Sequence, residues 1–308
     1  MSLPIVLSVD VLAGALGSVC IRGLLNLADR TALGYRRVSL ALTLFFNAVF
    51  PLILMLGVLA FMGGLNAEFG QLILHPAAIC NGFLTHASAS AFYRGLRDLP
   101  VRTICAVSKL SDLFLPAVVF LLGRQMALND GLFAMLSTAL FIPFLRGVGW
   151  KRRPAERWVI VMIVLLPLTQ TMVNHLTGAD HLAKEIFAFT QLFTAMMVWR
   201  VVAVLCTNFT GIWQELKEAT RERLNFVPML LGRSVLAVVA QALFFYAVTR
   251  ESGALAWPIL NAGPLLSSLF AHWVLRERLR RLEGMVLVAF GAAVVFCLLL
   301  RSGGRFSF

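Results

Sequence analysis

Ten long apolar segments joined by short loops are the feature that most constrains the fold of this chain. A helix needs roughly 20 mostly apolar residues to cross the hydrocarbon core of a bilayer. The candidate spans are residues 4–27, 38–62, 73–95, 100–122, 131–148, 157–177, 186–212, 226–249, 254–275 and 284–301. Charged residues make up only 14% of the chain, whereas soluble domains carry roughly 25%. The sequence therefore predicts an all-α integral membrane protein.

The chain also contains an internal repeat with a constant offset of 153 residues. Matched pairs at this offset are Ala87 and Ala240, Phe92 and Phe245, Tyr93 and Tyr246, Arg97 and Arg250, and Gly131 and Gly284. A fixed offset indicates one structural unit written twice. We therefore expect two five-helix repeats, residues 1–153 and 154–308, with no soluble domain. Because five is odd, the second repeat enters the membrane from the opposite face, as in many secondary transporters.

The basic residues are distributed unequally between the two sets of predicted loops. Of the 27 Lys and Arg residues, 18 lie in or beside the loops that follow odd-numbered spans, and five lie on the opposite side. The positive-inside rule places the first set in the cytoplasm and both termini outside. The net charge of +12 is thus explained by orientation in the membrane, and no nucleic-acid partner is expected. The short loops favour a bacterial inner membrane.

The C-terminal third carries a recognisable pattern. Pro258 precedes a span that ends Trp273-Val274-Leu275-Arg276-Glu277-Arg278-Leu279, and Gly284 and Gly291 follow seven residues apart. This pattern resembles the closing motif of EamA-like permeases of the drug/metabolite transporter superfamily. Gly17-Ser18 followed by Arg22 is similar to the first span of the same family.

The resemblance implies ten helices, of which spans one, three, four, six, eight and nine surround a central cavity. It also implies both termini in the cytoplasm, so the family and the loop charges favour opposite orientations. Small multidrug-resistance relatives carry a coupling carboxylate in the first span, where this chain has Gly14. Asp10, one turn earlier, is therefore a separate candidate for proton coupling.

Arg200 is the clearest ionisable group at membrane depth, because it lies near the middle of the predicted span 186–212. Such groups are costly in a membrane and usually have a functional or structural reason. A guanidinium matches a carboxylate or phosphate in two-point geometry, so substrate binding is one interpretation. Pairing with a fixed acid such as Asp10 or Asp112, or a shorter span from which the side chain reaches the interface, is the other.

Other polar groups within the spans are further candidates. Lys109 and Asp112 share a helix face at i,i+3, either as a self-contained pair or as a pair opened by substrate or proton. His86 is either a proton carrier or a hydrogen-bonded packing residue. The repeat pairs Ser88 with Gln241, Tyr93 with Tyr246, and Ser108 with Asn261.

These six repeat-related residues, together with Gln170 and Asn174 on the sixth span, are the predicted lining of the cavity. Interfacial aromatic residues are common in membrane proteins, and this is the alternative interpretation of both tyrosines. Arg200 and Lys109 complete the predicted substrate-binding set, and Asp10, Asp112 and His86 are the coupling candidates.

The sequence thus predicts a secondary transporter that moves a small anionic or zwitterionic metabolite by alternating access, coupled to protons or by exchange. A flippase for a lipid-linked phosphate or sugar is the alternative. His175 and Asp180 have the spacing of some acyltransferases, but the companion motifs are absent and no enzyme is expected. No cofactor or metal is expected either, and the partners are a small-molecule substrate and membrane lipid, with a homodimer left open.

Overall fold

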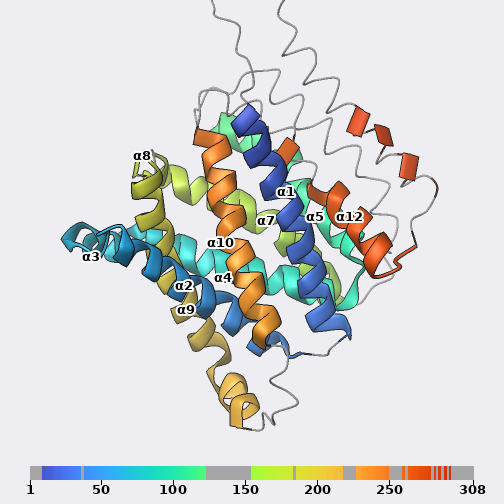
Figure 1. Cartoon of the computed structure of the whole chain (residues 1–308), viewed down its shortest axis with the longest axis horizontal. Helices are drawn as coiled ribbons and strands as arrows, with labels where there is room; N and C mark the ends of the chain where they lie inside the picture. Colours follow the sequence, from blue (N-terminus) through green and yellow to red (C-terminus); the bar gives the residue numbers. More distant parts are fainter. Residues whose placement is uncertain are drawn as a thin grey trace, which may run out of the picture. The chain divides into compact units, whose positions relative to one another are not determined.

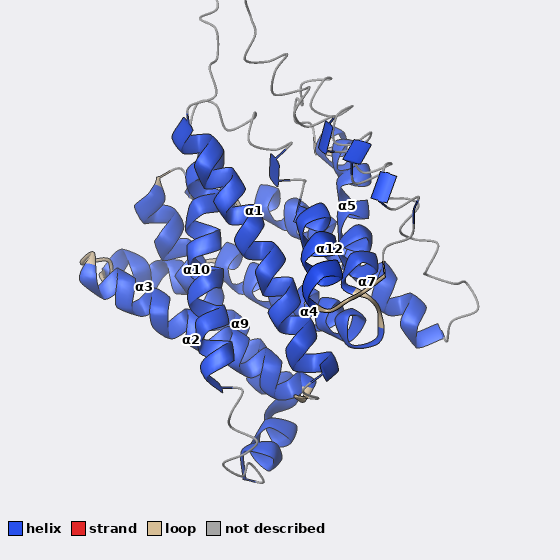
Figure 2. Ribbon diagram, turned by 45° about the vertical axis from the view of Figure 1, so that its right-hand side comes forward, coloured by secondary structure: helices blue, strands red, loops and turns tan. Residues whose placement is uncertain are grey.

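The computed structural model describes residues 9–35, 38–122, 154–182, 185–217, 227–249, 259–260 and 263–278, with short pieces between 281 and 292. Within these residues every regular element is a helix (Figures 1 and 2). The elements are α1 (Val9–Arg30), the π-helix η1 (Thr31–Tyr35), α2 (Leu40–Phe61), α3 (Ala67–Leu74), α4 (Pro76–Asp98), α5 (Val101–Leu121), α7 (Pro154–Leu176), α8 (Ala179–Leu182), α9 (Ile186–Lys217), α10 (Val227–Thr249) and α12 (Gly263–Val274). The predicted span 131–148 and most of 284–301 lie outside the described residues.

Five helices among the described residues are long and apolar enough to cross a membrane. They cover Asp10–Leu33, Leu40–Phe61, Arg157–Leu176, Ile186–Lys217 and Val227–Ala247. With 23 and 21 residues, α4 and α5 also have the length of a membrane span. The prediction of an all-α membrane fold is confirmed, whereas the arrangement of ten helices as two inverted repeats stays a prediction.

Local chemistry explains where α2 ends and α4 begins. Gly63 has φ +68°, a left-handed conformation that glycine adopts without a steric penalty. The N–H of Gly64 donates to the carbonyl of Leu59 at 2.7 Å, which satisfies an otherwise unpaired carbonyl at the helix end. At the start of α4, Nδ1 of His75 accepts from the N–H of Ala77. The helix therefore begins at Pro76, three residues later than the sequence predicted.

The described contacts group the chain into two compact units. Unit 1 contains residues 1–27, 100–152 and 239–308, and unit 2 contains residues 28–99 and 153–238. Each unit therefore combines chain from before and after residue 153. Both α1 and α10 contribute residues to each unit. The sequence boundary between the proposed repeats stays a prediction, because a contact unit and a sequence repeat are different properties.

In unit 2, α4 packs against α9 and α7, and α9 also packs against α2 and α3. Gly82 permits the close approach of α4 and α9. A Cβ atom at this position would lie 2.7 Å from the carbonyl oxygen of Met196 and 3.0 Å from the backbone nitrogen of Arg200. Small residues allow such close backbone contact between membrane helices. Gly82 therefore fixes the part of α9 that carries Arg200.

An apolar cluster closes one end of unit 2. It is formed by residues from the end of α2, from α3 and α8, and from the first turns of α4 and α9, namely Leu59, Phe69, Ala77, Ala78, Ala179, Leu192 and Ala195. Trp199 and Met196 are partly buried against it. Leu59 follows Asn47 on α2 by 12 residues, which corresponds to roughly 18 Å along a helix. The apolar cluster and the polar residues around Asn47 are thus well separated within this unit.

In unit 1, α5 packs against α12. Glu277, which belongs to the sequence motif after α12, accepts from the N–H of Val101 at 3.4 Å. Arg102 donates to the carbonyl of Arg278 at 2.6 Å. Because helix N-termini carry unpaired N–H groups and a partial positive charge, a carboxylate at this point stabilises the start of α5. The motif therefore has a structural role that its sequence alone did not predict.

Candidate functional site

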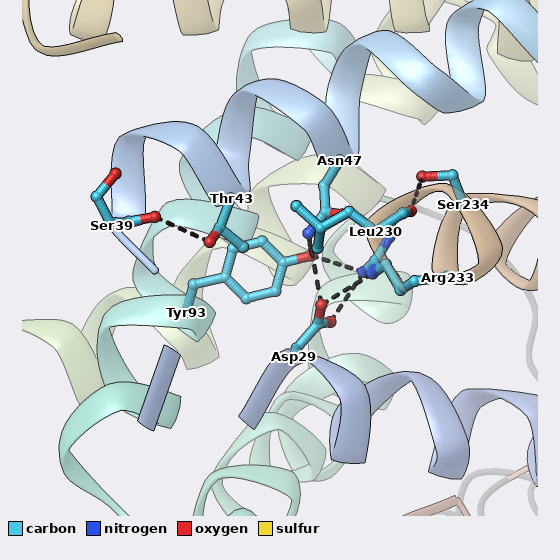
Figure 3. A network of polar contacts seen from close by, with 8 residues as sticks. All are labelled: Asp29, Ser39, Thr43, Asn47, Tyr93, Leu230, Arg233 and Ser234. Atoms are coloured by element: carbon cyan, nitrogen blue, oxygen red, sulfur yellow. Dashed lines mark hydrogen bonds and ion pairs between the residues drawn. The ribbon is translucent and has the colours of Figure 1, made fainter. Parts of the chain in front are cut away.

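The centre of the candidate site in unit 2 is a buried ion pair between α1 and α10 (Figure 3). The guanidinium of Arg233 donates from Nε to Oδ1 of Asp29 at 2.8 Å and from Nη2 to Oδ2 at 2.9 Å. Only 2% of the Asp29 side chain and 10% of the Arg233 side chain are exposed. This two-point geometry is the strong form of an arginine–carboxylate interaction.

Tyr93 of α4 and Asn47 of α2 complete the polar cluster. Arg233 also donates from Nη2 to the Tyr93 hydroxyl oxygen at 2.6 Å. The side-chain nitrogen of Asn47 donates to the same oxygen at 3.0 Å and lies 3.4 Å from Oδ1 of Asp29. Four helices thus contribute one buried side chain each, and Figure 3 shows these side chains converging.

Arg200 of α9 lies beside this cluster. Tyr93, Arg233 and Asp29 are the groups that interact with it electrostatically. Its Nη1 contacts the sulfur of Met197 at 3.9 Å. Its Nε is buried and has no hydrogen-bond partner among the described residues. The sequence-predicted Arg200 and Tyr93 are therefore brought together.

Sequence analysis missed Asp29, Asn47 and Arg233. Asp29 was placed in a loop because the first span was predicted to end at residue 27, but α1 continues to Arg30. The polar end stays helical because Asp29 binds Arg233 and because Arg30 donates to the carbonyls of Leu96 and Arg97. Arg233 lies inside the predicted span 226–249, and its charge was a signal that could have identified it.

The remaining predicted residues of unit 2 lie on α4 and α7. His86 is buried, and its Nε2 lies 2.9 Å from the hydroxyl of Thr207. That hydroxyl donates to the Ala203 carbonyl, so it accepts from His86, whose Nδ1 is buried without a partner among the described residues. The hydroxyl of Ser88 is likewise buried and unpartnered in the described structure. Gln170 donates to Thr85 at 3.5 Å, and Asn174 is half-buried on α7.

A second polar face runs along α1 in unit 1. The Tyr246 hydroxyl donates to Oδ2 of Asp10, and Ser18 donates to the Ala240 carbonyl at 2.9 Å. Arg22 donates to the side-chain oxygen of Gln241 at 3.0 Å. Asp10, Ser18 and Arg22 thus each contact a residue of α10.

Among the other predicted residues of unit 1, Ser108 donates to the Cys105 carbonyl at 2.8 Å. Lys109 is half-buried on α5. Asn261 and the side chain of Asp112 lie outside the described residues. Of the six repeat-matched positions, Ser88 and Tyr93 belong to unit 2 and the others to unit 1. A single cavity lined by all six stays a prediction.

The described residues offer no metal site, since no three His, Cys, Asp or Glu side chains among them could hold an ion. His175 lies in the last turn of α7, while the side chain of Asp180 is outside the described residues. The arrangement in unit 2 is suited to binding, because it holds donors and charges in fixed, buried positions between helices.

The apolar helices and the buried charges define an integral membrane protein with a polar site between helices. Residues 178–299 match the model of the EamA-like transporter family. This match confirms the predicted resemblance over the C-terminal part of the chain, and the matched family is one of transporters. A comparison with curated proteins found no match.

Proposed function

We propose that the chain is a secondary transporter that moves a small anionic or zwitterionic metabolite across the membrane by alternating access. The observation that supports this most is the buried cluster of Asp29, Arg233, Tyr93 and Asn47 with Arg200 beside it. Charged groups at membrane depth are costly and commonly mark substrate or ion pathways. The family match supports the transport class independently.

The proposal includes two inverted five-helix repeats, residues 1–153 and 154–308, and coupling either to protons or to exchange. Asp10, Asp112 and His86 are the coupling candidates. The support for His86 is its buried Nδ1, which has no hydrogen-bond partner in the described part of the chain and is able to accept a proton. The support for Asp10 is the hydrogen bond that its carboxylate accepts from Tyr246, because protonation of the carboxylate would change this hydrogen bond.

Within each unit, contacts also bring arginine-rich segments of the chain together. In unit 2, Arg30 at the end of α1 binds carbonyls at the end of α4. In unit 1, Arg102 at the start of α5 binds the carbonyl of Arg278, beyond the end of α12. These contacts agree with the distribution of basic residues along the chain. We propose that the loops after odd-numbered spans, which carry these arginines, are cytoplasmic in a bacterial inner membrane.

The first test is transport by the purified protein in liposomes. Compounds are chosen from a panel of amino acids, nucleotides, sugar phosphates and lipid-linked sugars by the increase in thermal stability that binding to the folded protein produces. The expected result is that a stabilising soluble compound enters the liposomes, and that a proton gradient or internal substrate accelerates its entry. Stabilisation by lipid-linked sugars alone would instead favour a flippase, and stabilisation without any movement across the bilayer would refute transport.

A further inference from the structure

The Tyr93 hydroxyl group has a proton that it donates to none of the described residues. Its oxygen accepts from Nη2 of Arg233 and from the amide nitrogen of Asn47. The orientation of the Asn47 amide follows from Asp29, because a carboxylate only accepts and the nitrogen must face it. None of the described residues accepts a hydrogen bond from Tyr93. The hydroxyl is therefore held as a donor by the groups that bind its oxygen.

Arg200 supplies further donors at the same place. Its Nε is buried and unpartnered among the described residues, and its Nη1 contacts the weakly accepting sulfur of Met197. The guanidinium also interacts with the Tyr93 hydroxyl. A buried donor without an acceptor costs free energy, so an acceptor that arrives with a ligand would stabilise this arrangement.

The charges of the cluster favour a negatively charged acceptor. Within the described residues, one carboxylate, Asp29, lies beside two guanidinium groups, Arg200 and Arg233. Arg233 already directs Nε and Nη2 at Asp29, and the same Nη2 also donates to Tyr93. It is therefore a positioning residue, whereas no second acid among the described residues matches the charge of Arg200. The described part of the site thus carries one surplus positive charge, which a single negative charge on a ligand would neutralise.

We propose that Arg200 and the Tyr93 hydroxyl together bind one oxyanion group, a carboxylate or a phosphate, of the transported molecule. The choice of an oxyanion follows from the planar guanidinium, which offers parallel donors to two oxygens. That this molecule is transported rests on the function proposed above, whereas the binding site itself does not. A soluble metabolite and a lipid-linked phosphate share this chemistry, and the experiment separates them.

The experiment measures the thermal stability of the detergent-purified full chain against matched pairs of compounds at constant ionic strength. Each pair contains an anion and its uncharged counterpart. The pairs are amine-blocked amino acids and their amine-blocked amides, sugar phosphates and their parent sugars, and a lipid-linked phosphate and its alcohol. We expect stabilisation by the anion and not by its neutral counterpart. The pair whose anion stabilises the protein shows whether the bound oxyanion belongs to a soluble metabolite or to a lipid.

Four variants test which residues bind the anion. Arg200→Gln is expected to weaken binding at least a hundredfold, and Arg200→Lys less, because the charge remains without the planar group. Tyr93→Phe removes one hydrogen bond to a charged group, so roughly a tenfold loss is expected. Arg97→Gln is the matched control, since Arg97 is exposed and pairs with Asp98 at the surface, and it should bind like the unchanged protein.

If a variant binds no ligand, the stability of the ligand-free protein provides a second test. Without ligand, Arg200→Gln should be at least as stable as the unchanged protein, because it removes the surplus buried charge. The inference is overturned if neutral compounds stabilise as well as anions, if no anion stabilises, or if stabilisation survives Arg200→Gln. Anion binding through Arg200 without movement into liposomes would leave this site intact and refute transport alone. Transport that does not depend on Arg200 would refute the anion site at Arg200 and leave the proposed transport function intact.

Discussion

Substitution of Asp29 and substitution of Arg233 should reduce the stability of the protein by different amounts, because Arg200 lies beside their ion pair. Asp29→Asn leaves two guanidinium groups beside each other with no carboxylate among the described neighbours. Arg233→Gln leaves Asp29 with Arg200 still nearby. The double variant restores the original local charge.

Removing one partner of a buried ion pair costs roughly 3–5 kcal/mol. We expect Asp29→Asn at the upper end of this range and Arg233→Gln at or below the lower end. At roughly 2 °C per kcal/mol for a chain of this size, Asp29→Asn should lower the apparent melting temperature by about 10 °C. The double variant should be more stable than Asp29→Asn, since paired removal leaves no uncompensated charge.

The assay is thermal unfolding of the detergent-purified variants, followed by intrinsic tryptophan fluorescence. Arg97→Gln serves as the control, because an exposed pair contributes little, about 0.5 kcal/mol or less. The reasoning would be refuted if Asp29→Asn were no more harmful than Arg233→Gln, or if the double variant were as unstable as Asp29→Asn.

Two further predictions concern helix packing and coupling. Gly82→Ala should force α4 and α9 apart, because its Cβ would lie 2.7 Å from the Met196 carbonyl oxygen, and it should lower both the melting temperature and anion binding at Arg200. Gly57→Ala meets nothing within 4 Å and should be neutral or slightly stabilising; equal effects in the two variants would contradict the packing argument. Asp10→Asn should leave binding unchanged and abolish the acceleration of uptake by a proton gradient, if Asp10 carries the proton. Gradient-driven uptake that persists in this variant would assign coupling to another group.

The helices and the membrane class followed from the sequence because they depend on local composition. Long apolar segments predict helices that satisfy their own backbone hydrogen bonds, and the helix bounds agree within a few residues over most of the described chain. The differences occur where polar residues extend a helix, as at the end of α1, or where a cap interrupts it, as His75 does before α4. These ends depend on contacts that an apolar pattern does not contain.

The candidate site could be predicted only in part. Arg200 and Tyr93 were identified because a charge inside an apolar segment and a repeated aromatic residue are visible in the sequence. Asn47 was not, since an isolated amide in an apolar span gives no sign of its partners. Its role depends on two contacts, with Asp29 and Tyr93, that come from other helices.

The sequence by itself determined that this chain is a helical membrane protein with charges at membrane depth, and its C-terminal part determined the family match. Only the tertiary structure decided which charges pair. Asp29 and Arg233 are 204 residues apart in the chain, and nothing in their local sequence links them. Their contact arises because the end of α1 and the beginning of α10 pack together within one unit, and this packing leaves Arg200 with a charge that no second acid matches among the described residues.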